Sequence, residues 1–348
     1  MNTLAQTTEQ QVKAFCARIG ADPLLVQGAG GNISWKDGDT LWVKASGTWL
    51  AQAKVKDIFV PVDLSSLQLA LSTQLFSVTP KTIGESSLRP SIETLLHALM
   101  PHKVVAHLHA IEILAYLVRA NPEEEFDRVI GDAVKWGCVD YFKPGAELAE
   151  AVAKLLAKAT DVDVVFLRNH GVVIGGKNVE QIENTLSQLL SALRGKLSSC
   201  VTDPASSAVD AALKAKGYSP SDDQEINQLA INEALSSRLQ SEWALYPDHV
   251  VFLGEEASIV EQLHDSSDLD NAVRTNPPFI FVIGQGVFES QSVTDAHKAQ
   301  LRCYYDVLVR QKASEKLISL NKSQIGEILN WDAEKYRQNT SSDKSGIR

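Results

Sequence analysis

Cysteine is scarce and scattered in this sequence. The four cysteines, Cys16, Cys138, Cys200 and Cys303, are far apart in 348 residues, and no two form a CxxC pair. This pattern argues against the disulfide framework of a small secreted domain and against a zinc site built from thiolates. The N-terminal segment is polar and has no apolar core, so it does not resemble a signal peptide. We therefore expect a cytoplasmic protein.

The chain also lacks an excess of basic charge and long apolar runs. Its formal net charge is −10, and no dense Lys/Arg cluster interrupts this acidic balance. Neither nucleic acid nor an anionic membrane surface is therefore expected as a partner. No run of about 18 apolar residues occurs, so no transmembrane helix is expected. The length and the 44% hydrophobic content suit a globular protein of about two domains.

A complete dinucleotide-binding fingerprint is missing as well. The loop Gly28-Ala29-Gly30-Gly31-Asn32-Ile33 has isoleucine at the third glycine position of GxGxxG, and Gly284-Gln285-Gly286 has Glu289 there. Together with Ser46-Gly47-Thr48, the first loop offers amides and hydroxyls to a phosphate or a hydroxylated ligand. The alternative is that both are ordinary glycine-rich turns.

Hydrophobic periodicity predicts an α/β protein. Asp37-Gly38 between two alternating segments indicates a hairpin. Before residue 200 we expect a helix at 7–19, strands at 32–36, 40–45 and 103–109, a helix opened by Pro90, helices at 110–120, 145–159 and 178–198, and strands at 162–169 and 170–176. Beyond residue 224 we expect helices near 225–241, 256–265 and 293–312, with strands at 249–253 and 279–284.

The segment 201–224 shifts to small and polar residues, which is typical of a domain boundary. We therefore predict a domain at 1–200, a linker at 201–224 and a smaller α/β domain at 225–330. A polar tail, 331–348, follows.

Two histidines in "KVVAHLH" raise the possibility of a metal site. His107 and His109 lie two positions apart on a predicted strand, so both side chains project from the same face, opposite Leu108. By itself this pair is weak evidence for a metal site and favours two packed core side chains over two ligands. His170 follows the strand "VVFLRN" and precedes Gly171, and three histidines with an open coordination position are the pattern of a catalytic metal site.

Glu93 stands near the start of the helix that leads into the histidine strand. A carboxylate beside a metal and a substrate carbon can act as a general base. A first-turn glutamate that only interacts with the helix dipole is the alternative, and the sequence leaves both open. His97, one helical turn later, is expected to support the site by hydrogen bonding.

Taken together, six segments resemble the class II aldolase/adducin family. They are Gly30-Gly31-Asn32-Ile33-Ser34, Ala45-Ser46-Gly47, Pro90-Ser91-Ile92-Glu93, His107-Leu108-His109, Tyr141 and Asn169-His170-Gly171. The matching part spans residues from about 10 to 198. The segment "PSIETLLHALMPHKVVAHLHA" is most similar to the aldolase half of bifunctional rhamnulose-phosphate aldolase/short-chain dehydrogenase proteins. The sequence contains no segment that resembles the dehydrogenase half of those proteins.

The resemblance implies a fold, an activity and a set of site residues. The fold is an αβα sandwich with a mainly antiparallel central sheet, assembled as a homo-oligomer (a tetramer or a dimer). The activity is metal-dependent aldol cleavage or formation of a C–C bond in a sugar or sugar phosphate, through a metal-stabilised enediolate. By the same resemblance, His107, His109 and His170 bind a divalent metal, typically Zn²⁺; Glu93 is the base and a possible ligand; Asn32, Ser46, Gly47 and Ser91 bind substrate; and Tyr141 reaches a neighbouring subunit's site as proton donor.

Other functions remain open from the sequence. Epimerases and dehydratases use the same metal–enediolate chemistry, and the adducin branch uses the fold as a non-catalytic interaction module. Ile92 replaces a serine common in fuculose-phosphate aldolases, which weakens the phosphate assignment. Arg89, Arg168 and Lys44 lie near the motifs, where each either meets an anionic substrate or is a solvated surface charge.

Overall fold

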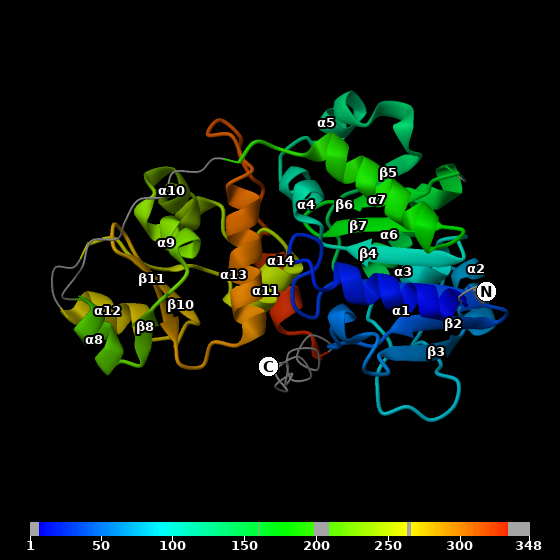
Figure 1. Cartoon of the computed structure of the whole chain (residues 1–348), viewed down its shortest axis with the longest axis horizontal. Coiled ribbons are helices and arrows are strands. Elements are labelled where there is room, and N and C mark those ends of the chain that lie inside the picture. The colour runs from blue at the N-terminus through cyan, green and yellow to red at the C-terminus, as the bar shows by residue number, and fades with distance from the viewer. Residues whose placement is uncertain (1–6, 160, 198–208, 263–265, 333–348) are drawn as a thin grey trace, which may run out of the picture. The chain divides into compact units, whose positions relative to one another are not determined.

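The chain folds into two compact units (Figure 1). The computed structural model describes residues 7–159, 161–197, 209–262 and 266–332. The first unit comprises Met1–Leu117, Asn121–Arg194 and Trp331–Arg348, and the second comprises Val118–Ala120 and Gly195–Asn330. Most residues before position 195 belong to the first unit and most residues after it belong to the second. The short segment 118–120 is an exception, because it belongs to the second unit.

The first unit is built on a seven-stranded sheet with the order β3-β2-β1-β4-β7-β6-β5. Every neighbouring pair is antiparallel except β5 and β6, so the predicted mainly antiparallel sheet is confirmed. Gly38, with φ of 55°, turns β1 back into β2, as the Asp-Gly signal predicted. The strands are β1 (Asn32–Asp37), β2 (Thr40–Lys44), β3 (Phe59–Asp63), β4 (Val104–Leu108), β5 (Trp136–Val139), β6 (Val164–Leu167) and β7 (Gly171–Gly176).

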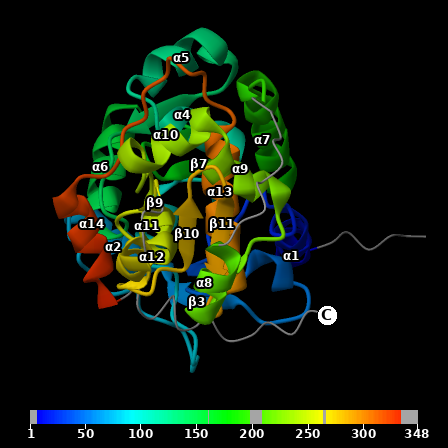
Figure 2. The same cartoon turned by 90° about the vertical axis from the view of Figure 1, so that its left-hand side faces the viewer.

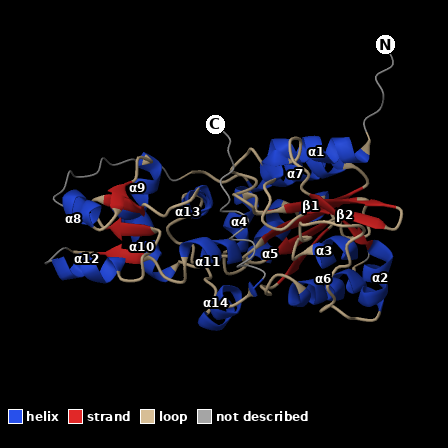
Figure 3. Cartoon of the chain, turned by 90° about the horizontal axis from the view of Figure 1, so that it is seen from below, coloured by secondary structure: helices blue, strands red, loops and turns tan. Residues whose placement is uncertain are grey.

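Helices cover both faces of this sheet, which makes the unit an αβα sandwich (Figure 3). One layer contains α1 (Thr8–Ile19), α4 (Ile111–Leu117) and α7 (Val179–Leu193). The other contains α2 (Leu64–Ser72), α3 (Thr94–Leu99) and α6 (Ala146–Lys158), and α5 (Pro122–Val129) follows α4. At the start of α1, Thr7 and Gln10 form a capping box, which satisfies backbone N–H groups that lack a partner within the helix.

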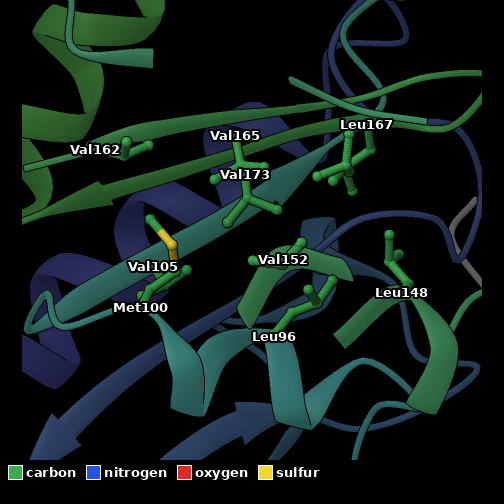
Figure 4. Close-up of a cluster of buried hydrophobic side chains, with 10 residues drawn as sticks. Leu96, Met100, Val105, Leu148, Val152, Val162, Val165, Leu167 and Val173 are labelled. Carbon is green, nitrogen blue, oxygen red and sulfur yellow. The ribbon is translucent and has the colours of Figure 1, made fainter. Parts of the chain in front are cut away.

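An apolar cluster between the sheet and the α3/α6 layer fixes the direction in which β4 faces (Figure 4). Val105 of β4 packs there with Leu96 of α3 and Val152 of α6. Burying each such side chain stabilises the fold by about 1.5–3 kcal/mol. Because alternate residues of a strand share a face, His107 points to the same side as Val105. The core therefore directs His107 toward the layer that carries Glu93.

The second unit has a four-stranded sheet with the order β8-β11-β10-β9, in which only β9 and β10 are parallel. Figure 2 shows β9, β10 and β11 of this sheet, and α8 and α12 pack on the sheet through Leu213 and Leu269. The predicted smaller α/β domain is thus present. Its strands are β8 (Tyr218–Pro220), β9 (Ser258–Val260), β10 (Phe279–Val282) and β11 (Gly286–Ser290); its helices are α8 (Val209–Ala215), α9 (Gln224–Ile231), α10 (Glu233–Ser241), α11 (Pro247–Leu253), α12 (Ser266–Val273), α13 (Asp295–Leu308) and α14 (Lys322–Leu329).

Three secondary-structure predictions for this unit were wrong. The predicted strand at 249–253 is part of helix α11, because Pro247 suits a first helical turn and every residue of the apolar run is buried, so no alternation marks it. The helix predicted at 225–241 divides at Asn232, whose side chain caps α10. The helix predicted at 256–265 contains strand β9 instead, and residues 263–265 lie outside the described residues.

The structure also differs from the predicted linker and from the predicted start of the helix at Pro90. Residues 209–220 of the 201–224 segment form α8 and β8, while 201–208 lie outside the described residues. Of the predicted tail 331–348, only 331 and 332 are described. The helix predicted to open at Pro90 begins at Thr94, with Glu93 at its N-cap.

The sequence predicted neither a disulfide framework nor a transmembrane helix. Cys16, Cys138 and Cys303 carry free thiols, and Cys200 lies outside the described residues. No helix among the residues described is both long and apolar enough to cross a membrane.

Candidate metal centre

The topology gathers the motif segments at one edge of the seven-stranded sheet. Strands β4 and β6 are both antiparallel to β7, so they run in the same direction and end at the same edge. Strand β1, antiparallel to β4, begins there with Asn32 paired to His107. Strand β2 ends at this edge and is followed by Ser46 and Gly47. Residues up to 138 positions apart in sequence, from Asn32 to His170, thus meet.

The three predicted histidines form one buried cluster. Ligand atoms of His107, His109 and His170 all lie within 4.8 Å of one another. The Nε2 atoms of His107 and His109 are 3.1 Å apart, and each of the three side chains belongs to a residue no more than 5% exposed. The alternative of two unrelated packed histidines does not describe this arrangement, because the rings converge on a common point.

The orientation of His107 is fixed by the backbone of β7. Its Nδ1 donates to the carbonyl oxygen of Val172 at 3.2 Å. Burial lowers the pKa of His107 well below its ordinary value, so the ring is neutral and Nδ1 carries its proton. Nε2 therefore presents a lone pair to the cluster, which is the form of imidazole that binds a metal.

A glycine makes the close approach of the rings possible. A Cβ at Gly171 would lie 2.5 Å from the carbonyl oxygen of Leu108, 3.0 Å from Cδ2 of His109 and 3.1 Å from Cε1 of His107. Just before it, Asn169 adopts a left-handed conformation with φ of 52°, which turns the chain from β6 into β7 and leaves His170 at the tip. Only a residue without a side chain fits at position 171.

Glu93 faces the histidines from the N-cap of α3. Its Oε2 lies 3.4 Å from Nε2 of His107, and its Oε1 lies 3.3 Å from Nε2 of His170. Burial alone would raise the pKa of this carboxyl. The Coulombic attraction of a proton carried by the facing His107 or His170 and a hydrogen bond from Asn32 outweigh that effect and lower the pKa to about 2. Glu93 is therefore a buried carboxylate.

Three further buried side chains support Glu93. Nδ2 of Asn32 donates to Oε2 of Glu93 at 2.8 Å, and Oδ1 of Asn32 contacts Nε2 of His97. On the other side of the ring, Nδ1 of His97 lies 2.8 Å from the hydroxyl of Ser34. Burial lowers the pKa of His97 to about 4, so this ring is neutral. His97 supports the site by hydrogen bonding, as its spacing from Glu93 predicted.

The predicted ligand loops lie beside one another, and Lys44 connects them. Its buried ammonium donates to the carbonyl oxygens of Ala29 and Gly31, both at 2.9 Å. Neither sequence alternative for Lys44, a substrate contact or a solvated charge, describes this role. A buried ammonium needs such partners, since desolvation without them is costly.

The other predicted site residues occupy defined positions. The amide of Ser46 donates to the carbonyl of Arg89 at 2.9 Å, and Gly47 has a φ of 77°. The hydroxyl of Ser91 accepts from the amide of Glu93 at 3.2 Å, which leaves its own proton available to a ligand. Tyr141 follows β5 at the same sheet edge, and its hydroxyl is shielded from solvent. Its role as proton donor stays a prediction.

Two contributions were not predicted from the sequence, namely the carbonyl of Val172 as partner of His107 and the role of the Lys44 ammonium as donor to the glycine loop. Backbone acceptors carry no side-chain signal, and nothing local marks a lysine as buried. Arg168, which the sequence suggested as a contact for an anionic substrate, forms an ion pair with Asp140, with 3.2 Å between its Nη1 and Oδ1 of Asp140.

The donor set fits a divalent transition-metal ion. Four ligand atoms bound tetrahedrally at about 2.0–2.1 Å stand roughly 3.3 Å apart. The His107–His109 separation of 3.1 Å and the two Glu93–histidine separations of 3.3 and 3.4 Å agree with this spacing. Oε1 of Glu93 is buried and accepts no hydrogen bond from the described residues, and such an atom requires an explanation. A bound cation supplies one.

Comparison with known proteins places this geometry in context. The model of the class II aldolase and adducin N-terminal domain family matches residues 10–195. An L-fuculose phosphate aldolase of Methanocaldococcus jannaschii is 31% identical over 179 residues, which are 49% of this chain and 85% of that protein. An uncharacterized oxidoreductase of Bacillus subtilis, YuxG, is 29% identical over 178 residues, which are 47% of this chain and only 25% of that protein. A solved N-terminal class II aldolase domain from Thermoplasma acidophilum is 27% identical, with a TM-score of 0.46, and the match covers 56% of this chain and 97% of that one.

The matched range includes the glycine loop, Glu93 and all three clustered histidines. It takes in more than half of the chain, and the aldolase relative is matched over most of its own length. The oxidoreductase is matched over a quarter of its length, which agrees with the predicted likeness to the aldolase half of fused proteins. The chain belongs to the class II aldolase and adducin N-terminal domain family.

Proposed function

We propose that this protein is a metal-dependent aldolase that cleaves or forms a carbon–carbon bond in a sugar phosphate. The observation that carries the proposal is the buried set of His107, His109, His170 and Glu93 at one sheet edge. The likeness to an L-fuculose phosphate aldolase supports the substrate class. A non-catalytic interaction module would have no need to keep a carboxylate and three imidazoles buried together, since burying such groups is costly.

The three histidines would hold the ion, and zinc suits them best. Magnesium and calcium prefer oxygen ligands, whereas imidazole nitrogens suit zinc. When bound, the ion supplies Lewis-acid stabilisation of the negative charge that develops on the substrate's carbonyl and hydroxyl oxygens. Neutral imidazoles leave the positive charge of the ion undiminished, in contrast to thiolates.

Glu93 is the general base of the proposed reaction. In the synthetic direction its carboxylate takes a proton from the carbon next to the substrate carbonyl, and in the cleavage direction it returns that proton. The carboxylate is ionised at neutral pH, which a general base requires. Tyr141 protonates the aldehyde oxygen in the synthetic direction, supplied by a neighbouring subunit of a homo-oligomer. Ser46, Gly47, Ser91 and Asn32 bind the phosphate or the hydroxyl groups.

The first experiment measures the metal content of the purified chain. We expect about one divalent ion per chain in the wild type and little in a His107→Ala/His109→Ala variant. His102→Ala is the matched control, because His102 is paired with Asp163 and precedes β4 at the opposite sheet edge. Equal, near-zero metal in the wild type and the double variant after incubation with zinc would contradict the metal centre.

The second experiment measures the reaction. The zinc-loaded wild type is incubated with a panel of ketose 1-phosphates and free ketoses, and aldehyde release is followed. Glu93→Gln should lower kcat by about 10²–10⁴-fold, because a general base contributes about that much. Product analysis separates cleavage from epimerisation and dehydration. A metal-loaded wild type that releases no aldehyde from any member of the panel would contradict the aldolase assignment.

A further inference from the structure

The carboxylate of Glu93 has two oxygens in different surroundings. Oε2 accepts a hydrogen bond of 2.8 Å from Asn32, whereas Oε1 accepts none from the described residues and lies 3.3 Å from Nε2 of His170. The side chains behind Oε2 are deeply buried: Asn32 is 5% exposed, and His97 and Ser34 are 0% exposed. Both oxygens face the histidine cluster, since Oε2 also lies 3.4 Å from Nε2 of His107, but only Oε2 is held by a hydrogen bond from the surrounding side chains.

The hydrogen bonds behind Oε2 have one consistent direction. A carboxylate only accepts, so Asn32 must donate through Nδ2 and present Oδ1 to His97. An amide oxygen also only accepts, so Nε2 of His97 carries the proton. With the ring neutral and its proton on Nε2, Nδ1 accepts from the hydroxyl of Ser34, and the backbone carbonyl of Val105 is a further polar group beside the ring. Every donation in the chain Ser34–His97–Asn32 therefore points toward Glu93.

This order leaves Glu93 little freedom to rotate. Rotating the carboxylate out of its present plane would break the contact with Asn32, and flipping the Asn32 amide would place an NH₂ group against the protonated nitrogen of His97. Hydrogen bonds to a charged acceptor are stronger than neutral ones, and a chain of them polarises its members. The buried ring of His97 thus helps to hold the plane of the carboxylate, in which one oxygen accepts from Asn32 and the other accepts no hydrogen bond from the described residues.

We propose that His97 is a positioning residue that fixes Oε2 of Glu93 through Asn32 and makes Oε1 the oxygen that exchanges the proton with the substrate. This inference rests on the proposed aldolase function. In the synthetic direction the C–H bond of the substrate breaks, its electron pair stays on the substrate, and Oε1 takes the proton. The cleavage direction reverses these changes.

Two substitutions of similar size test the proposal. In His97→Gln the side-chain amide nitrogen reaches the position of Nε2 and keeps the donation to Asn32, whereas His97→Leu has no donor. Loss of an outer-shell partner of a metal site typically costs 10–100-fold in activity. We expect His97→Leu to lower kcat by about that factor with KM within about twofold of wild type and metal content unchanged. His97→Gln should recover at least about tenfold of the loss. Equal kcat values in the two variants would overturn the proposal.

A spectroscopic measurement on the wild type is independent of activity. In protein labelled with ¹⁵N-histidine, the signals of His97, assigned by their absence in His97→Gln, should be those of a neutral ring with its proton on Nε2. A proton on Nδ1, or a charged ring at neutral pH, would overturn the direction of the hydrogen-bond chain. A wild type that is inactive on the sugar panel would instead contradict the proposed function. The NMR result would still decide whether the hydrogen bonds from Ser34 through His97 and Asn32 to Glu93 have the proposed direction.

Discussion

Gly171 provides a sharp test of how closely the fold controls the metal centre. Its φ is not in the left-handed region, so alanine is excluded only by space. In Gly171→Ala the new Cβ would lie 2.5 Å from the backbone oxygen of Leu108, about 0.9 Å short of the 3.4 Å at which ordinary contact begins. A backbone oxygen in a paired strand cannot rotate away. Strands β4 and β7 must therefore separate, or the rings of His107 and His109 must turn.

A displacement of this size has predictable consequences. Overpacking should lower the free energy of unfolding by about 1–3 kcal/mol. Moving ligands by nearly 1 Å should weaken metal binding by about 10–100-fold and reduce kcat/KM by about 100-fold. Competition with a chromophoric chelator measures the metal affinity, and urea unfolding measures the stability.

The matched control for this substitution is Gly326→Ala in α14. Apart from the backbone of α14 itself, no atom of the described residues lies within 4 Å of the Cβ that it adds, so it should leave metal binding unchanged and stabilise the helix by up to about 1 kcal/mol. If Gly171→Ala binds zinc within twofold of wild type and unfolds at the same urea concentration, the steric argument is refuted.

Two further predictions concern buried charged or titratable groups. Burial lowers the pKa of His249 to about 3, so the neutral ring stabilises the fold fully above pH 6.5 and this contribution is lost as the pH falls toward 3, at up to about 1.4 kcal/mol per pH unit. The drop in unfolding free energy between pH 7 and pH 5 should therefore be about 2 kcal/mol smaller in His249→Phe than in wild type, and an equal drop would contradict it. Lys44→Met should lower the free energy of unfolding by about 1–3 kcal/mol and raise KM for a sugar phosphate, because the carbonyls of Ala29 and Gly31 lose their donor. The control Lys54→Met, at an exposed position, should change neither the stability nor KM.

The second unit illustrates where sequence patterns stop being informative. The run "HVVFL" suits a strand and a buried helix equally, and the structure buries all of α11, so no polar face distinguishes the two. Asn232 can sit within a helix or begin one, and here its side chain caps α10. In both cases the outcome depends on neighbours far away in the chain.

By itself the sequence determined the hairpin at Asp37-Gly38, the strand that carries His107 and leads directly to His109, the candidate glutamate at the start of a helix and the family. Turn chemistry, alternation and local motifs are properties of adjacent residues, so they can be read directly. Only the tertiary structure decided that Asn32 and Glu93, 61 residues apart, share a hydrogen bond, that Lys44 is buried, and that the two oxygens of Glu93 differ. Those facts follow from strand order and register, which bring distant side chains to one sheet edge and which local patterns do not specify.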